Sequence, residues 1–510
     1  MPATPALPAP DAPLAAVDMG SNSFRLEIAQ FVRGSYRRIV YLKETVRLGA
    51  GLDADGALTD EAAERGLACL RRFAERLAGF APAQVRAVAT QTLREASNRD
   101  AFLARAQAAL GHAIEVISGR EEARLIYAGV AHLQPGPKRR LVIDIGGRST
   151  EMILGQGARP TKAESFAVGS VSLSLRHFPD GVMTPERFRA AQVAAGAELE
   201  EALAPFAPGT WDEALGSSGT AGAVSQLIQA LGHADGVITP RRLQGLIERC
   251  IAAGHVDRLD LPGLREDRKP VIAGGLALLY TFAAQFGIER LAPAKGALRQ
   301  GVIVELHERL AAQRDGASAA PRGDRRDASV RDLQRRFEVD RAQAARVRAV
   351  ALALYRGVQP DDDEGARELG WAADLHEMGL MVSHHDHHRH SAYLLGHVDA
   401  EAFSQTQQRR LATIVLGQRG GLRKIDAALA EPRLALQVLA LRIAAIKCHA
   451  RADVRADALA LSLDGRTARL AFGEAWADAR PRTLYLLHEE AEQWARVDAL
   501  RLVLERRDWH

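Results

Sequence analysis

The sequence has few cysteines and no excess of charge of either sign. Three of its 510 residues are cysteine, far apart and without a CxxC pair, which excludes a disulfide scaffold and is typical of reduced thiols in a cytoplasmic protein. Its 67 Lys+Arg nearly balance 63 Asp+Glu, which argues against a nucleic-acid-binding polycation. With 47% hydrophobic and 25% charged residues, the composition excludes disorder over most of the chain.

The sequence also lacks a segment that we predict to cross a membrane. The longest uncharged run, 270–288, contains Gly274-Gly275, Thr281 and Gln285, and we interpret it as a buried core helix. The first residues are rich in Pro and Ala without the basic-then-apolar order of a signal peptide. We therefore expect 1–14 to be a disordered leader of a cytoplasmic protein, and leave peripheral association with a membrane open.

A repeat organises the first part of the chain. The apolar segment 14–18 ends in Asp18 and is followed by small residues, and the segment 141–144 ends in Asp144 and continues in the same way. Superposing the two copies also aligns Asn22 with Arg148. Two copies 126 residues apart predict duplicated α/β domains with a cleft between them.

Length and linker composition divide the chain further. A stretch of small and polar residues at 313–330 is typical of a linker, and the pattern beyond it is mostly helical. Two short strands near 458–472 predict a terminal hairpin. We predict domains at 15–134, 135–312, 331–440 and 441–510, the last a small α+β domain.

Four segments place glycine or hydroxyl residues at the end of a strand: 18–23, 90–94, 144–150 and 216–220. Such loops expose backbone N–H groups and hydroxyls, which suit phosphate oxygens. No GxxxxGK[ST] motif is present, which excludes the usual P-loop enzymes. Asp18 and Asp144 are candidate Mg²⁺ ligands. The alternative is that the loops are only turns and the acids only caps.

These segments resemble the exopolyphosphatase/guanosine pentaphosphate phosphatase family. The resemblance rests on VDMGSNSF at 17–24, ATQTLR at 89–94, ISGREEARLI at 117–126, VIDIGGRSTE at 142–151 and GSSGT at 216–220, and continues through LHEMG at 375–379 and HRHSAY at 388–393. It implies an actin/hexokinase/Hsp70-like duplicated fold, an HD-like helical domain after the linker, a homodimer, and Mg²⁺-dependent removal of a terminal phosphate. A monovalent cation such as K⁺ is left open.

The resemblance also implies roles for residues. Glu122 would be the catalytic base, Glu151 would help to hold metal or water with Asp144 and Asp18, and Arg94 would contact phosphate. The remaining predicted phosphate ligands are Ser21, Asn22, Ser23, Gly146, Gly147, Arg148, Ser149, Thr150, Ser218, Gly219 and Thr220. The alternative for Arg94 is that it forms a surface salt bridge. The alternative for Glu122 is that it is a solvated glutamate at the start of a helix.

The sequence departs from the family where a third glycine is usual and Arg148 stands. Because Asn22 fills the equivalent position of the first copy, we expect the turn to tolerate a side chain, and we hypothesise that Arg148 adds a phosphate contact.

Two further features invite a functional interpretation. Histidines crowd 384–390, which suggests a metal site. The His-Asp pair of a working HD enzyme is His376-Glu377 here, however, so the resemblance implies lost metal chemistry.

Ten arginines against six acids at 314–348 either line a route for a polyanion or form a solvated linker and helix face. The route predicts that neutralising Arg325, Arg326, Arg335 and Arg336 weakens long chains more than short ones.

We therefore predict an exopolyphosphatase that releases orthophosphate from polyphosphate, since 388–395 resembles that branch more closely. A guanosine pentaphosphate (pppGpp) 5′-phosphatase with the same site is the alternative. A sugar kinase or Hsp70-like ATPase of the same fold is disfavoured by the paired Glu121-Glu122 and the HD-like half.

Overall fold

A computed structural model describes residues 8–314, 324–452, 455 and 458–507. The chain divides into two compact units, with the boundary between Ala319 and Ala320. The predicted linker 313–330 lies partly outside the described residues, and a helix already begins at Arg325. Residues 8–13 of the predicted leader precede the first strand without helix or strand structure.

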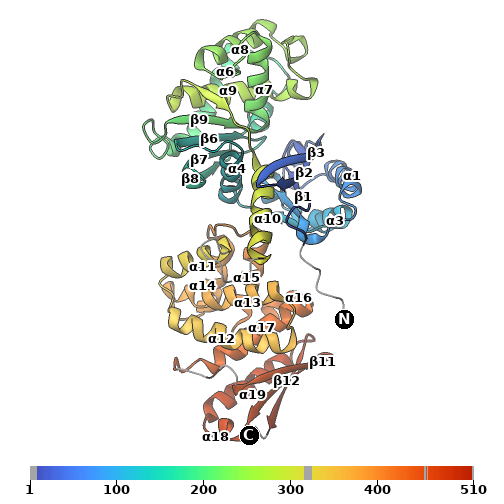
Figure 1. The fold of residues 1–510 in the computed structure, drawn as a ribbon, viewed down its shortest axis with the longest axis vertical. Helices are drawn as coiled ribbons and strands as arrows, with labels where there is room; N and C mark the ends of the chain where they lie inside the picture. The colour runs from blue at the N-terminus through green and yellow to red at the C-terminus, as the bar shows by residue number, and fades with distance from the viewer. Residues whose placement is uncertain (1–7, 315–323, 453–454, 456–457, 508–510) are drawn as a thin grey trace. The chain divides into compact units, whose positions relative to one another are not determined.

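The first unit contains two sheets of the same topology (Figure 1). The strand order is β3-β2-β1-β4-β5 in one and β8-β7-β6-β9-β10 in the other, with the first three strands antiparallel and the rest parallel in each. The predicted duplication is therefore confirmed. The strands are β1 (Leu14–Met19), β2 (Ser23–Val32), β3 (Ser35–Thr45), β4 (Val85–Ala89), β5 (Ile114–Val116), β6 (Arg139–Ile145), β7 (Thr150–Gln156), β8 (Arg159–Phe166), β9 (Glu213–Ser217) and β10 (Leu291–Pro293).

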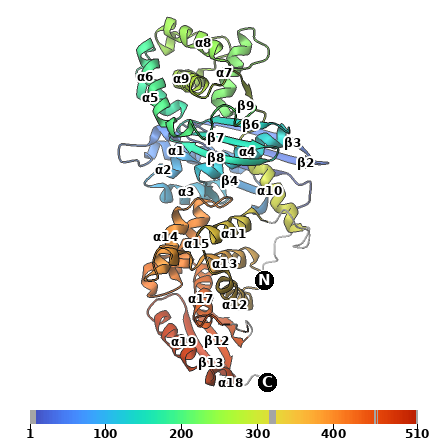
Figure 2. The ribbon, with the colours of Figure 1, turned by 90° about the vertical axis from the view of Figure 1, so that its left-hand side faces the viewer.

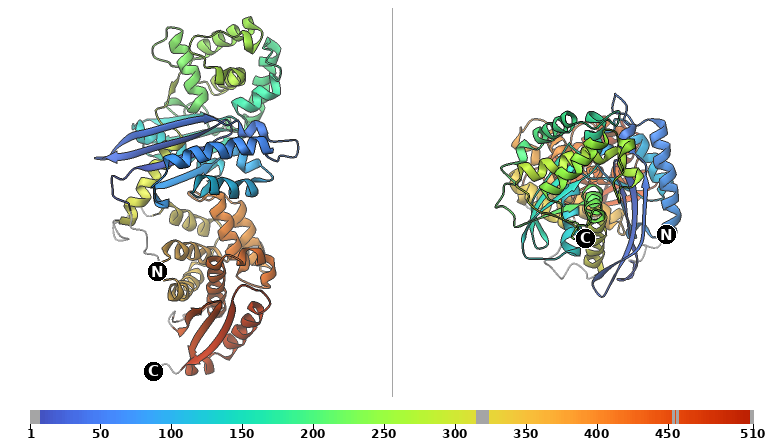
Figure 3. Two further views of the ribbon diagram at one scale, coloured as in Figure 1. Left: turned by 90° about the vertical axis from the view of Figure 1, so that its right-hand side faces the viewer. Right: turned by 90° about the horizontal axis from the view of Figure 1, so that it is seen from above.

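Both sheets are covered by helices on their outer faces. Helices α1 (Asp60–Arg76) and α3 (Arg99–Leu110) share a core with the first sheet (Figure 3). Helices α5 (Ser170–His177), α6 (Pro185–Glu198), α7 (Ser218–Ala230), α8 (Pro240–Ala253) and α9 (Lys269–Gln285) belong to the core of the second (Figure 2). The predicted apolar helix 270–288 is α9, whose buried residues include Leu276 and Leu278. No helix among the described residues combines the length and hydropathy that a membrane span requires.

Two helices join the halves of this unit. α4 (Gly119–Leu133) and α10 (Leu298–Arg314) pack against each other, and their apolar side chains form one core with residues of both sheets, among them Ala16 and Val142. Ser118 caps α4 by accepting a hydrogen bond from Glu121 N at 3.2 Å. Because Glu122 lies in this first turn, the packing of α4 between the sheets determines where that carboxylate lies.

The second unit has a single core of helices and a small sheet. The predicted boundary near 440 falls inside α17, and Leu470 of the terminal sheet belongs to the same core as the helices. Its elements are α11 (Arg325–Arg336), α12 (Arg341–Val358), α13 (Asp363–Leu375), α14 (His387–His397), α15 (Gln405–Gly417), α16 (Asp426–Leu429), α17 (Pro432–Lys447), β11 (Ala460–Asp464), β12 (Thr467–Gly473), α18 (Glu474–Asp478), α19 (Pro481–Trp494) and β13 (Arg501–Arg507).

The arginine-rich stretch contains a structural residue. Arg326 is 4% exposed, pairs with Asp324 at 2.7 Å and Glu364 at 2.8 Å, and lies 4.4 Å from the ring centre of Trp371. Its side chain is part of the core boundary of the second unit. Neutralising Arg326 therefore tests the fold, which corrects its inclusion among the residues of a substrate route.

Candidate functional site

The loops at the carboxyl ends of the central strands meet in one pocket. Because β4 runs parallel to β1 and β9 parallel to β6, the ends of these strands lie at one edge of each sheet, as in other open α/β sheets. The pocket holds about 610 Å³ of space, part of it open to solvent. The predicted site residues in its lining are Asp18, Ser21, Asn22, Ser23, Glu122, Asp144, Gly146, Gly147, Ser149, Ser218, Gly219 and Thr220.

The second half supplies a helix N-terminus to this pocket. α7 begins directly after β9 at Ser218, and its first residues line the pocket. The first amides of a helix lack intrahelical acceptors and favour anions. Ser218 has φ +64° and donates from Oγ to Asp144 Oδ2 at 2.6 Å. A non-glycine residue in this region costs about 1–2 kcal/mol, so the fold stabilises a strained residue at the pocket.

The two repeated aspartates have opposite surroundings. In the second half, Glu151 faces Asp144 across the antiparallel β6–β7 pair. In the first half, Arg25 faces Asp18 across β1–β2 and donates to Asp18 Oδ2 at 3.1 Å, and Arg299 of α10 donates to the same oxygen at 3.3 Å. Like charges on opposite cross-strand positions destabilise a sheet, so a cation or a proton bound at the acidic pair of the second half would stabilise it.

Glu122 lies at the pocket with a single ion-pair partner among the described contacts. Arg94 Nη1 donates to Glu122 Oε2 at 2.8 Å and to the carbonyl oxygen of Ile117 at 3.0 Å. Burial raises the pKa of Glu122 to about 7, against the opposing effect of Arg94. A carboxylate whose pKa lies near neutrality is suited to accept a proton from water at physiological pH.

Burial also raises the pKa of Asp144, and raises that of Glu151 well above its usual range with Glu122 contributing. Glu151 is 1% exposed and accepts a hydrogen bond from Ser165 Oγ at 2.8 Å.

Within the described part of the chain, no three acidic, histidine or cysteine side chains converge closely enough to ligate a metal by themselves. The donor set fits Mg²⁺, which is commonly held by one or two carboxylates together with substrate phosphates and water.

Four predicted residues do not line the pocket: Arg94, Arg148, Thr150 and Glu151. Thr150 is fully buried, and its hydroxyl donates to the carbonyl oxygen of Val168 at 2.6 Å. Arg148 pairs with Glu95 at 2.9 Å, so the structure does not bring its guanidinium to the pocket. Its φ is outside the left-handed region, in agreement with the expectation that this turn tolerates a side chain.

Sequence reasoning missed two cationic residues of the pocket, Arg25 and Arg268. The Arg268 guanidinium lies against Gly219, where a Cβ atom would collide with it. Burial and the neighbouring Arg25 lower the pKa of Arg268, as expected for cations gathered to face an anion. Arg268 belongs to no glycine-rich loop, so the loop motifs carried no signal for it. The pocket is also lined by Gly20, Thr90 and Ser170, which were not among the predicted site residues.

The histidines of 384–390 do not form a metal centre among the described residues. His387 and His388 are buried on α14, with ring centres 6.1 Å apart. The Nδ1 atoms of both rings lack a hydrogen-bond partner among the described residues. His376 is also buried, and its Nδ1 lies 2.7 Å from the carbonyl oxygen of Ala373. These side chains pack as neutral rings.

Acid is expected to destabilise the second unit through these rings. Burial lowers the pKa of His387 and of His388 to about 4, with His376, Glu377, His384 and Arg419 acting on the first ring and Lys424, Asp386 and Arg389 on the second. Since an unfolded histidine titrates near 6.5, stability is complete above that pH and declines as pH falls toward 4. Each ring contributes a loss of about 1–2 kcal/mol by pH 5.

Urea unfolding at pH 7.5 and at pH 5.0, followed by a probe in the second unit, measures this loss. The variant His387→Phe/His388→Phe keeps flat, buried rings that cannot titrate, so its stability is expected to fall by less over the same interval. An equal fall in both proteins would show that other groups cause the acid sensitivity.

Comparison with known proteins identifies relatives for nearly all of the chain. The Ppx/GppA phosphatase family matches residues 27–310, and domain III of Ppx/GppA phosphatases matches residues 325–491. A guanosine-5′-triphosphate,3′-diphosphate pyrophosphatase of Pseudoalteromonas atlantica is 38% identical over 480 residues, which is 92% of this chain and 93% of the relative.

Solved structures match more than half of the chain. An exopolyphosphatase from Cytophaga hutchinsonii is 24% identical with a TM-score of 0.53, over 58% of this chain and 98% of that one. An exopolyphosphatase-like protein is 25% identical with a TM-score of 0.52, over 59% and 100%. The predicted placement nearer the exopolyphosphatase branch is not supported, because the curated relative that is 38% identical bears the pyrophosphatase name.

Proposed function

Because this chain belongs to the Ppx/GppA phosphatase family, as the matches over 27–310 and 325–491 show, we propose that it hydrolyses the terminal 5′-phosphoanhydride of pppGpp and releases orthophosphate. One observation carries the choice of substrate: the relative named for guanosine 5′-triphosphate 3′-diphosphate is 38% identical over 92% of the chain. The alternative of the sequence analysis thus becomes the leading function.

The pocket residues support this chemistry. Glu122 takes a proton from a water molecule while the water oxygen forms a bond to the terminal phosphorus, and the bridging P–O bond breaks toward the remaining phosphates. The amides at the start of α7, the hydroxyls of both loops, and Arg25 and Arg268 surround the anionic phosphates. Arg94 holds the Glu122 carboxylate at 2.8 Å.

Asp144 and Glu151 are the residues that would hold Mg²⁺, since they face each other across β6–β7 and Asp144 lines the pocket. When bound, the ion would neutralise charge on the phosphate oxygens. Asp18 is less suited to this role than the sequence analysis proposed, because Arg25 and Arg299 already donate to its Oδ2.

Inorganic polyphosphate is the second candidate substrate. The segment 388–395, which resembles exopolyphosphatases, favours it. Backbone amides and hydroxyls bind terminal phosphates of either molecule, so the pocket lining alone does not separate the two. The homodimer implied by the resemblance stays a prediction.

Release of orthophosphate from pppGpp and from long-chain polyphosphate, compared at equal concentrations of chain ends with Mg²⁺, tests the proposal. We expect kcat/KM for pppGpp to exceed that for polyphosphate by about tenfold or more, equivalent to about 1.4 kcal/mol of transition-state binding. The reverse ratio would make polyphosphate the substrate. Phosphoryl transfer from ATP to a sugar, without release of orthophosphate, would reject hydrolysis altogether.

A further inference from the structure

Arg148 lies in the turn between β6 and β7 of the second half, and its side chain reaches the first half of the unit. Its Nε and Nη2 lie 3.0 and 2.9 Å from Glu95 Oε2, and Nη1 donates to the carbonyl oxygen of Gly49 at 3.2 Å. The side chain passes over Gly49, where a Cβ atom would lie 2.8 Å from Arg148 Cδ. These contacts join the two halves of the unit, and separating the halves would break them.

The contact continues through α2 (Gln91–Glu95). The second carboxylate oxygen of Glu95, Oε1, accepts from Gln91 Nε2 at 2.6 Å. The other end of the same amide, Gln91 Oε1, accepts from Arg94 Nε at 2.9 Å. Positions 91, 94 and 95 share one face of this single helical turn, because residues three and four apart are neighbours.

The last bond of the series reaches the proposed base. Arg94 Nη1 donates to Glu122 Oε2 at 2.8 Å, and the side chains of both residues are 10% exposed. An unbroken series of hydrogen bonds therefore joins the turn between β6 and β7 to Glu122 by way of α2 in the first half. Arg148 does not itself line the pocket, and these bonds give its guanidinium a path to Glu122.

We propose that Arg148 is a positioning residue for the Arg94–Glu122 pair. It acts through Glu95 and Gln91, and couples closure of the halves to the orientation of the base. The proposal rests on the proposed function of Glu122. It depends on the Arg148 side chain, because a glycine at this position could not reach Glu95.

Kinetics of single and double variants test this proposal. Arg148→Ala and Glu95→Ala should each lower kcat for pppGpp about two- to fivefold, the range of a partly exposed ion pair, with KM nearly unchanged. The double variant should fall no further than either single variant, because both interrupt one series. Arg148→Lys, which keeps a cation within reach of Glu95, should retain most of kcat.

The matched control is Arg187→Ala. Arg187 pairs with Asp180 inside the second half, and their side chains are 33% and 55% exposed against 26% and 34% for Arg148 and Glu95. Its kcat should equal that of the wild type. Additive losses in the double variant, or an unchanged kcat in Arg148→Ala, would overturn the proposal.

A direct contact between Arg148 and the substrate gives a different pattern. Arg148→Ala would then raise KM, and Glu95→Ala would lower KM because it frees the guanidinium for phosphate. That pattern would also overturn the positioning role. If the wild-type protein hydrolyses no phosphoanhydride, the proposed function is wrong. The clamping of the two halves by Arg148 is therefore tested by a separate measurement that does not depend on activity.

That measurement uses spin labels on cysteines introduced at Ala108 of α3 and Ala190 of α6, two exposed positions in opposite halves. The native cysteines are buried and leave the labels specific. Arg148→Ala should broaden the distance distribution at low salt. A distribution identical to that of the wild type would contradict the clamping of the halves by Arg148.

Discussion

Replacing Glu122 by glutamine is expected to lower kcat for phosphate release about 10²- to 10⁴-fold, the range of a general base. Glutamine has nearly the same shape, and its amide oxygen can still accept the hydrogen bond that Arg94 gives at 2.8 Å. It cannot take a proton from water. KM should therefore change little, because the phosphate-binding loops are untouched, and single-turnover measurements should show the loss in the chemical step.

Glu164→Gln is the matched control for this experiment. Glu164 lies on β8 and pairs with Arg120 at 3.0 Å, with its side chain 30% exposed. Its replacement changes charge near α4 without touching the pocket lining and should leave kcat within twofold. If Glu122→Gln keeps more than a tenth of wild-type kcat on both pppGpp and polyphosphate, Glu122 is not the base.

The outline of this site was predictable from local sequence. The repeated strand-Asp-turn pattern predicted two related sheets, because an apolar run followed by small residues is a local signal. Pairing of the parallel strands then places the loops after β6 and β9 at one edge of the second sheet, and the packing of the two halves brings the loop after β1 to the same pocket. Glu122 and Arg94 were named from the family resemblance, which covers most of the chain.

The roles of the charged residues required the register and the packing of distant elements. Asp18 looks equivalent to Asp144 in the repeat, but cross-strand pairing gives the first an arginine and the second a glutamate. Arg148 meets Glu95, 53 residues earlier, and Arg326 is buried against Trp371 although its local sequence reads as linker. Pairing over such separations has no local signature in sequence.

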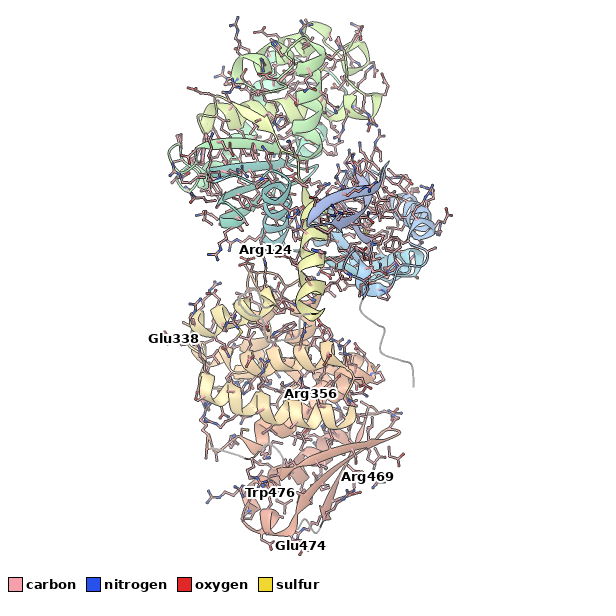
Figure 4. The ribbon with its side chains drawn as sticks, in the orientation of Figure 1. Arg124, Glu338, Arg356, Arg469, Glu474 and Trp476 are labelled. Carbon is pink, nitrogen blue, oxygen red and sulfur yellow. The ribbon has the colours of Figure 1, made fainter. Side chains whose placement is uncertain are left out.

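A buried ionic cluster behind Glu122 shows how the packing of α4 and α10 serves the site. Glu305 of α10 pairs with Arg86 of β4 at 3.0 Å and also with Arg124 of α4, and all three residues are at most 4% exposed. Arg124 also pairs with Glu121 at 2.7 Å, and Figure 4 places Arg124 on α4 beside α10. The neighbours Glu121 and Glu122 thus face a structural cluster and the pocket respectively.

Replacing Glu305 by glutamine should therefore lower the free energy of unfolding by about 3–5 kcal/mol, because two buried guanidinium groups lose their shared counter-charge. The carboxylate is held well below its usual pKa by Arg124 and Arg86 despite burial, so it is ionised at neutral pH and its charge is what the variant removes. Urea unfolding of the full chain measures the loss. Glu198→Gln, at an exposed position of α6, is the control and should change stability by less than about 0.5 kcal/mol. A loss below about 1 kcal/mol for Glu305→Gln would mean that Glu121 and Glu115 compensate both arginines without it, and that α4 is held by apolar packing alone.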